Sequence, residues 1–218
     1  YLPAHRALSK LLRKLGHWEE LIELTETEAE TLRGGMLVGD RRDPLRVARL
    51  AEIGRLWEHE IGDLERAAEA YQRILESDPG HVDALYALER IYESTEKWLE
   101  LMELLEREVE LVEDEGWAAA LLQRIGELAE AHHSDGNLAV LYYRRALAIQ
   151  PAYLPALTSL GRIYTKGERF RELLAMFRTE AEVTEDPRRR ASIYLRIGEL
   201  HELRLHELDA AEDAYRES

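Results

Sequence analysis

The 218-residue sequence contains no cysteine, few glycines and prolines, and no long apolar run. Without cysteine, disulfides, thiol catalysis and thiolate metal sites are excluded. No stretch approaches the roughly 18 uncharged apolar residues of a membrane span, so no membrane partner is expected. The 13 glycines and 6 prolines fall mostly between apolar-periodic segments, which is typical of long helices joined by short turns.

Basic residues are also too few to balance the acidic ones. The sequence has 29 Lys and Arg against 44 Asp and Glu, a net charge of −15, which disfavours a nucleic-acid partner. The basic residues are nearly all arginine, a bias that favours a GC-rich bacterial source. The compartment is left open, with a cytoplasmic location favoured.

The main signal is an internal repeat. Gly54, Gly126 and Gly198 are separated by 126 − 54 = 72 and 198 − 126 = 72 residues. Tyr71 and Tyr143 keep the same spacing, and residues 124–128 recur as 196–200. Repetition at this scale predicts a solenoid, in which each unit buries its apolar face against its neighbours.

Each 72-residue unit divides into two helical hairpins, because apolar residues follow the 3.6-residue period in pairs of segments. The pattern predicts one solenoid over 1–218, as a fragment of a longer chain, with hairpins at about 1–33, 46–80, 81–112, 117–152, 153–184 and 188–218. It predicts helices near 3–15, 17–33, 46–61, 64–77, 81–94, 97–112, 118–133, 137–149, 153–165, 168–183, 188–204 and 207–217. Six large aromatic residues are expected to be largely buried between helices: Trp57, Tyr71, Tyr92, Tyr143, Tyr164 and Phe177.

Two short patterns resemble the tetratricopeptide repeat (TPR) family. The first-helix signature is matched by Leu157-x-x-Leu160-Gly161-x-x-Tyr164 and by Leu50-x-x-Ile53-Gly54-x-x-Trp57, and the second-helix signature by Ala67-x-x-x-Tyr71 and Ala139-x-x-x-Tyr143. The resemblance covers nearly the whole chain. It implies an all-α fold, a right-handed α-solenoid of antiparallel helical hairpins. Ser9 and Glu89 replace the small residue of the pattern in two hairpins, where looser helix contacts are expected.

One insertion and both ends depart from a regular array. About eight extra residues fall within 34–45, which is either an apolar-tipped binding loop or a tolerated surface insertion. The segments 3–15 and 207–217 keep the apolar positions of internal repeats, whereas capping repeats become polar. Further repeats are therefore expected on both sides, together with self-association through these terminal helices.

No constellation in the sequence supports catalysis, a cofactor or a metal. His201 and His206 resemble a zinc-protease helix, but their spacing of five directs them apart, and His132 and His133 diverge likewise. All four histidines are expected at the surface near helix ends. The chain is therefore predicted not to be an enzyme.

The remaining place for function is the concave groove that the TPR resemblance assigns to the first helix of each hairpin. The predicted partner-binding residues are Arg6, Lys10, Arg13, Arg55, Tyr86, Arg90, Glu93, Gln123, Glu127 and Arg162. Lys10, Arg55, Arg90 and Arg162 share one register and could hold an acidic or carboxylate-bearing segment. Alternatively, Arg55–Glu58 and Arg90–Glu93 are local pairs three residues apart on their own helices.

Three functions stay open. The first is a scaffold or adaptor that binds a partner protein segment in the groove. The second is a structural spacer that stacks end to end in a larger protein. The third is a regulatory array attached to an enzyme domain outside this sequence.

Overall fold

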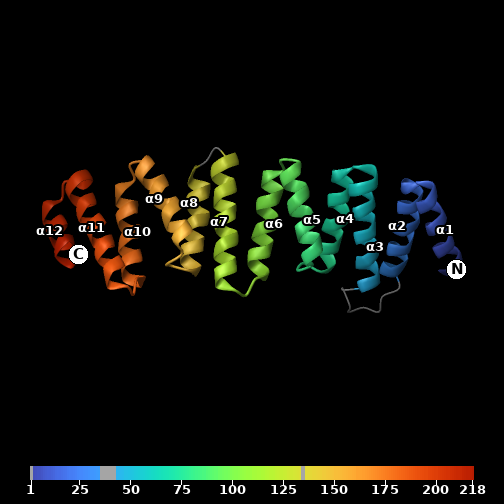
Figure 1. Ribbon diagram of the computed structural model, residues 1–218, viewed down its shortest axis with the longest axis horizontal. Coiled ribbons are helices and arrows are strands. Elements are labelled where there is room, and N and C mark those ends of the chain that lie inside the picture. The colour runs from blue at the N-terminus through green and yellow to red at the C-terminus, as the bar shows by residue number, and fades with distance from the viewer. Residues whose placement is uncertain (1, 35–42, 134–135) are drawn as a thin grey trace. The chain divides into compact units, whose positions relative to one another are not determined.

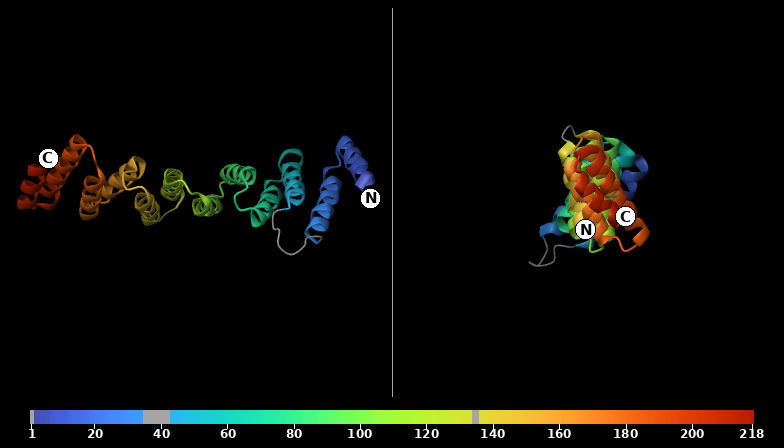
Figure 2. Two further views of the ribbon diagram at one scale, coloured as in Figure 1. Left: turned by 90° about the horizontal axis from the view of Figure 1, so that it is seen from below. Right: turned by 90° about the vertical axis from the view of Figure 1, so that its left-hand side faces the viewer.

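The structure, a computed structural model, describes residues 2–34, 43–133 and 136–218, with the backbone only of residues 2, 3 and 32–34. Within these ranges the chain is helical and contains no strand (Figure 1). It divides into two compact units, unit 1 (Tyr1–Arg107) and unit 2 (Glu108–Ser218), each with its own core. Within each unit, consecutive helices lie side by side as antiparallel hairpins (Figure 2).

Unit 1 consists of three helical hairpins. Its elements are α1 (Leu2–Leu15), α2 (Trp18–Gly34), α3 (Pro44–Arg55), the π-helical segment η1 (Leu56–Ile61), α4 (Leu64–Ser77), α5 (Val82–Ser94) and α6 (Trp98–Leu111), whose last turn passes into unit 2. Unit 2 continues with α7 (Glu115–His132), α8 (Gly136–Ile149), α9 (Leu154–Lys166), α10 (Phe170–Val183), α11 (Pro187–Leu200), the π-helical segment η2 (His201–Leu205) and α12 (Leu208–Glu217). The odd-numbered helices are called the first helices below, and the even-numbered ones the second helices.

The predicted helices are confirmed, and aspartate caps explain where several begin. The Asp63 carboxylate accepts a hydrogen bond from the Arg66 backbone N–H at 3.0 Å, which satisfies a free donor at the start of α4. Asp114 does the same for the N–H of Trp117 at 2.6 Å. Helix α7 therefore begins at Glu115, three residues before the predicted start at 118.

The two π-helical segments were not predicted. Each ends a first helix where the chain turns: Gly62 after η1 and His206 after η2 have left-handed backbone conformations, with φ of 83° and 57°. In η1 the N–H groups of Gly62 and Asp63 both reach back to the carbonyl of Trp57. This arrangement satisfies a carbonyl that would otherwise lack a donor at the end of the helix.

The repeated glycine allows the two helices of a hairpin to approach closely. A Cβ placed on Gly126 would lie 2.4 Å from a ring carbon of Tyr143, and one on Gly54 would lie 2.7 Å from Tyr71. No carbon pair tolerates such distances, so only glycine fits under the tyrosine ring. Helices α5 and α6, where Glu89 occupies the glycine position, approach each other less closely, as the sequence predicts.

The aromatic core is confirmed at five of its six predicted positions. Tyr71, Tyr92, Tyr143, Tyr164 and Phe177 are buried. Trp57 is half-buried, and the Arg66 guanidinium lies over its ring, 4.5 Å from the centroid. Of the predicted 34–45 insertion, residues 35–42 lie outside the described ranges.

A candidate protein-interaction surface on the first helices

The predicted groove residues lie on first helices, and nine of the ten are exposed. Exposed side chains are those of Arg6, Lys10, Arg13, Arg55, Tyr86, Arg90, Glu93, Glu127 and Arg162. They fall in both units. The seven from Arg6 to Glu93 belong to unit 1, and Glu127 and Arg162 belong to unit 2.

Gln123 contradicts the prediction of an outward position. Its side chain is only 6% exposed. The reason is that α9 packs over it: the amide nitrogen donates to the Ser159 hydroxyl at 3.1 Å and to Glu127 Oε1 at 2.9 Å. Gln123 therefore joins α7 to α9 inside unit 2, and its amide group is not presented to a partner.

Two of the four cations in the predicted basic register are held by carboxylates of the preceding hairpin. In unit 1, Arg90 Nη2 lies 2.5 Å from Glu58 Oε1, and Tyr71 donates its hydroxyl to Glu58 Oε2 at 3.1 Å. Arg55 and Glu58, which lie three residues apart in the sequence, do not form the local ion pair that was the alternative. The carboxylate instead joins α5 to the α3–α4 hairpin.

The same arrangement recurs in unit 2. Arg162 donates both guanidinium nitrogens to Glu130, at 2.5 and 2.6 Å, and Tyr143 donates its hydroxyl to Glu130 Oε2 at 3.3 Å. The hydrogen bonds from Arg162 lower the pKa of Glu130 below its usual range. Burial, reinforced by Glu130, raises the pKa of Tyr143 to about 12. We call this repeated set the Tyr–Glu–Arg latch, and it is structural: it joins consecutive hairpins.

The latch was missed, although the sequence held its signal. Glu58, Glu130 and Glu202 follow the 72-residue spacing, as do the tyrosines that bond to them. At the third position Tyr215 donates to Glu202 Oε2 at 2.7 Å. Arg90 and Arg162 keep the same 72-residue spacing, so periodicity could have found each residue of the latch, but not that the arginine pairs with a carboxylate of the preceding hairpin.

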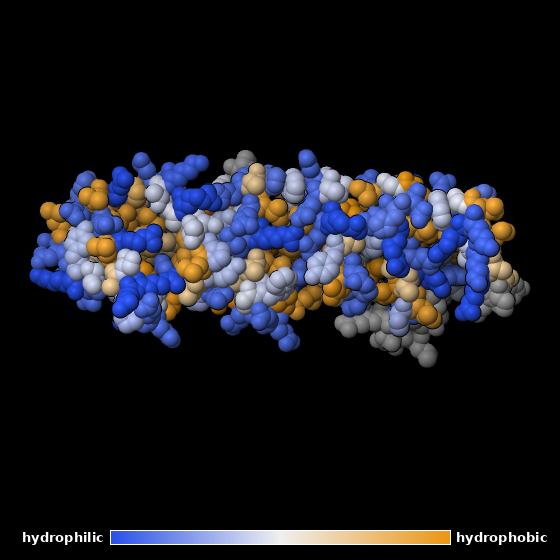
Figure 3. Space-filling model, in the orientation of Figure 1, coloured by the Kyte–Doolittle hydropathy of each residue, from blue (hydrophilic) through white to orange (hydrophobic). Residues whose placement is uncertain are grey.

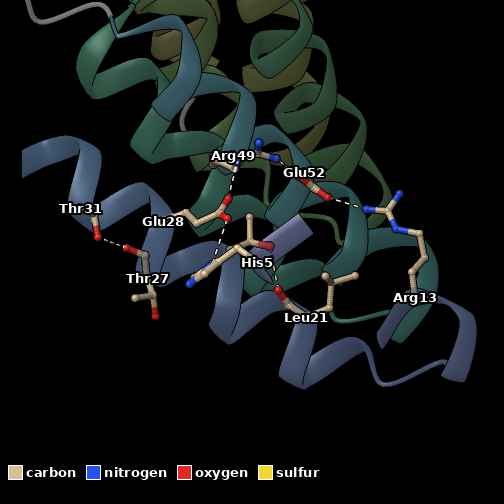
Figure 4. A network of polar contacts seen from close by, with 9 residues as sticks. His5, Arg13, Leu21, Thr27, Glu28, Thr31, Arg49 and Glu52 are labelled. Carbon is tan, nitrogen blue, oxygen red and sulfur yellow. Dashed lines mark hydrogen bonds and ion pairs between the residues drawn. The ribbon is translucent and has the colours of Figure 1, made fainter. Parts of the chain in front are cut away.

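Arg13 is likewise occupied, by a polar network between α1, α2 and α3 (Figure 4). Glu52 accepts from Arg13 at 2.5 Å and from Arg49 at 2.7 Å, and Arg49 reaches Glu28 at 2.9 Å. His5 Nδ1 lies 3.2 Å from the other oxygen of Glu28. The network ties the first hairpin to α3, so Arg13 contributes to packing within unit 1.

Of the cations in the predicted groove set, Arg6, Lys10 and Arg55 stay available. Among the described residues none of them has a carboxylate partner; the Arg55 guanidinium donates only to the Ala51 carbonyl of its own helix, at 3.1 Å. Arg55 borders an open pocket of about 520 Å³ on the first helices of unit 1. The pocket is lined by Arg13, Ala48, Arg49, Glu52, Arg55, Leu56, His59 and Glu60.

His201 contradicts the prediction that the histidines lie at the surface. It is 3% exposed, with Nδ1 2.8 Å from Glu207 Oε2 and Nε2 3.4 Å from an Arg178 nitrogen. Its position is the repeat equivalent of Ala129, which is fully buried, so the spacing could have indicated this. His132, His133 and His206 are exposed, as predicted. In the described parts of the chain, no cluster of three His, Cys, Asp or Glu could hold a metal ion.

The surface seen in Figure 3 is largely hydrophilic, with apolar side chains in separate patches among the charged ones. Searching the described residues, we find no helix with the length and apolar character needed to cross a membrane.

Comparison with known proteins supports the repeat assignment. Residues 84–116 and 156–191 match the sequence profile of the tetratricopeptide repeat. No curated protein sequence matches the chain.

Several solved structures resemble the chain at low identity. MamA is 15% identical over 96% of this chain and 91% of its own, with a TM-score of 0.37. YrrB, described as a TPR protein with an unusual peptide-binding site, is 21% identical over 78% and 87%, with a TM-score of 0.38. BtubC from P. vanneervenii is 17% identical over 99% and 77%, with a TM-score of 0.36. At such scores, what these proteins do does not extend to this chain.

Proposed function

Because this chain is a tetratricopeptide-repeat protein, we propose that it works as an interaction scaffold whose first helices bind a segment of a partner protein. Repeats of this family are typically non-catalytic scaffolds. The finer proposal concerns the site. In unit 1 the partner segment lies along α1, α3 and α5 and brings carboxylates to Arg55, Lys10 and Arg6.

The observation that carries this proposal is the set of cations without carboxylate partners. In a chain of net charge −15, carboxylates are abundant, and Arg13, Arg49 and Arg90 are all paired within unit 1. Arg6, Lys10 and Arg55 have no such partner among the described residues, and Arg55 borders an open pocket. An acidic segment would pair with them, and Arg can hold a carboxylate through two parallel hydrogen bonds.

A charge-reversal experiment tests the site. Peptides would first be selected against the chain from a random display library, and their affinities measured by fluorescence anisotropy. Replacing Lys10 and Arg55 by Glu should weaken the selected peptides at least tenfold and reduce the salt dependence of binding. The matched control is the double variant Arg107→Glu and Arg144→Glu, which makes the same change in net charge at two exposed arginines on second helices. Equal loss in the control would show that only net charge matters.

A labelling experiment tests whether the peptide binds to the first or the second helices. Because the sequence has no cysteine, an introduced cysteine is the only thiol that can react. Tyr86→Cys places a single thiol on first helix α5, and Leu99→Cys places one on second helix α6; the replaced side chains are 62% and 61% exposed. Bound peptide should protect the thiol at 86 from alkylation and leave that at 99 unchanged. Protection at 99 alone would move the surface to the second helices.

End-to-end association is a second candidate, favoured by complementary terminal elements. Helix α1 carries Arg6, Lys10, Arg13 and Lys14 with no acidic residue, and exposes Leu8, Leu11 and Leu15. Helix α12 carries Asp209, Glu212, Asp213 and Glu217 against Arg216 alone, and exposes Leu208. One copy's α1 would pack on another's α12.

Sedimentation velocity at low and high salt tests this association. The chain should form larger species at low salt, and Leu11→Glu should abolish them. Leu99→Glu is the control, since Leu99 is equally exposed but lies on α6. A monomer at high concentration and at every salt concentration would refute end-to-end association without affecting the partner site.

A further inference from the structure

The glycine of helix α9 differs from the glycines of the latch hairpins. Tyr71 and Tyr143 follow their glycines by 71 − 54 = 17 and 143 − 126 = 17 residues, and their rings cover them. Seventeen residues after Gly161 the chain has Arg178 instead. A Cβ placed on Gly161 would meet nothing nearer than the Met176 terminal methyl, at 3.7 Å. The surface above Gly161 is therefore not filled by the fold.

An open pocket of about 510 Å³ lies there, between α9, α10 and α11 in unit 2. This volume falls within the roughly 300–1,000 Å³ of small-ligand sites. Its lining combines three buried apolar side chains, those of Leu157, Met176 and Phe177, with charged residues. We call it the Gly161 pocket.

The charged residues around the pocket leave two cations available. Arg162 is held by Glu130, and the buried carboxylate of Glu180 accepts from Arg189 at 2.9 Å. Lys166 and Arg196 are exposed and have no ion pair with a described residue. The Arg196 guanidinium lies over the Phe177 ring, 4.3 Å from its centroid. A cavity with buried apolar side chains beside two cations that have no ion pair is complementary to a ligand with an apolar group next to an anionic one.

We propose that the Gly161 pocket takes one aliphatic or aromatic side chain of a partner protein segment, and that a neighbouring carboxylate of that segment pairs with Lys166 and Arg196. The apolar side chain gains from leaving water against Leu157, Met176 and Phe177. The carboxylate gains a charge-assisted hydrogen bond from Arg196, whose position on the ring limits the freedom that is lost on binding. This inference rests on the first helices being the interaction surface, and it adds a second, chemically distinct site in unit 2.

Methionine-methyl NMR tests the inference directly. The chain has only three methionines, so carbon-13 labelling of their methyl groups gives few signals, of which Met176 reports the pocket and buried Met102 in unit 1 serves as the internal control. The probes are three capped hexapeptides of glycine and serine, identical except for a central leucine–glutamate, leucine–glutamine or serine–glutamate pair. We expect the leucine–glutamate peptide to shift the Met176 signal at millimolar concentration and leave Met102 in place. The other two should bind about tenfold more weakly.

Two variants test the contribution of the pocket and that of Lys166 and Arg196 separately. Gly161→Leu fills the pocket, and should abolish the Met176 shift with all three peptides. Replacing Lys166 and Arg196 by Gln should make the leucine–glutamate and leucine–glutamine peptides bind alike. Arg107→Gln is the control, since it removes one exposed cation outside both proposed sites and should leave the titration unchanged. Circular dichroism and the position of the Met102 signal verify that each variant is folded.

The outcomes are distinct from those of the unit 1 experiment. No Met176 shift with any peptide, or an unchanged affinity in Gly161→Leu, would overturn the pocket while leaving the Arg55 site standing. Equal binding of the leucine–glutamate and leucine–glutamine peptides to the unmodified chain would remove the carboxylate from the proposal. Loss of binding in Arg107→Gln would show that the peptides respond to the net charge of the chain, and would overturn the pocket.

Discussion

Substituting the glycine under a latch tyrosine gives a sharp test of the packing argument. In Gly126→Ala the new methyl group would lie 2.4, 2.6 and 2.9 Å from three ring carbons of Tyr143. Favourable carbon–carbon contacts begin near 3.5 Å. The Tyr143 ring is fully buried, so it cannot simply turn into solvent.

The expected magnitude follows from two opposing effects. Alanine is favoured over glycine inside a helix by about 0.8–1 kcal/mol. Overpacking of a filled core costs about 1–3 kcal/mol, and an overlap above 1 Å belongs at the upper end. A shift of the ring also strains its hydrogen bond to Glu130. The net expectation is a loss of about 2 kcal/mol in the free energy of unfolding.

Gly161→Ala is the matched control within the same unit. Its methyl group would meet only the Met176 methyl, at 3.7 Å, which is an ordinary contact. The helix preference then acts alone, and the variant should be more stable by about 0.8–1 kcal/mol. The two substitutions make the same chemical change and should differ by about 3 kcal/mol in opposite directions.

Urea unfolding followed by circular dichroism measures both variants, with hydrogen exchange of the α7 and α9 amides to separate local from global effects. In a Tyr143→Leu background, Gly126→Ala should lose most of its cost, because the ring that it meets is gone. The reasoning fails if Gly126→Ala is as stable as the unmodified chain, or if both alanine variants change stability by the same amount.

Three further predictions follow from the caps and the latch. Asp114→Ala should cost about 1 kcal/mol and shorten α7 toward the start predicted from sequence, which hydrogen exchange at Glu115–Ala118 would show; unchanged protection there would argue against the cap. Burial raises the pKa of Tyr71 and Tyr143 to about 12 in the folded chain, so the stability that they contribute is fully present below pH 10 and is lost as the pH rises through 12. Ultraviolet titration should show these two phenols ionising after the exposed ones, and ionisation of both near pH 10 would contradict the prediction. Glu130→Gln should lower the free energy of unfolding by no more than about 1 kcal/mol, because the ion pair with Arg162 is exposed. Since the pKa of Glu130 is lowered in the folded chain, the stability that it contributes is present above the usual carboxyl range and is lost on acidification. The Gln variant should lack that part of the pH dependence of stability.

Much of the fold could be predicted because its determinants are local. The helices follow from apolar residues at a 3.6-residue period, and their ends follow from Asp63, Pro79 and Pro151. The core tyrosines could be found because the 72-residue spacing places the same residue in the same environment twice. The family assignment depends on the same repetition, and needed no long-range contact to be known.

The site was predicted less completely, because exposure and pairing depend on neighbours that lie far away in the sequence. Arg55 and Tyr86 are exposed on their first helices, as predicted, but Gln123 is covered by α9. The basic line was predicted as one feature, whereas Arg90 and Arg162 are held by carboxylates 32 residues earlier. A pattern three or four residues apart shows which side chains share a helix face, and says nothing of which helix packs against that face.

The sequence by itself determined the repeat, the helices and the residues of the core, since hydrophobic periodicity and backbone capping act over a few residues. The sequence shows that Arg178 stands where the tyrosine would recur, but only the tertiary structure shows that the surface at Gly161 is left open. Gly126 and Gly161 occupy the same place in the same signature, yet one lies under the Tyr143 ring and the other faces an open pocket. The difference arises because the second helix of each hairpin, and not the glycine, determines what lies above it.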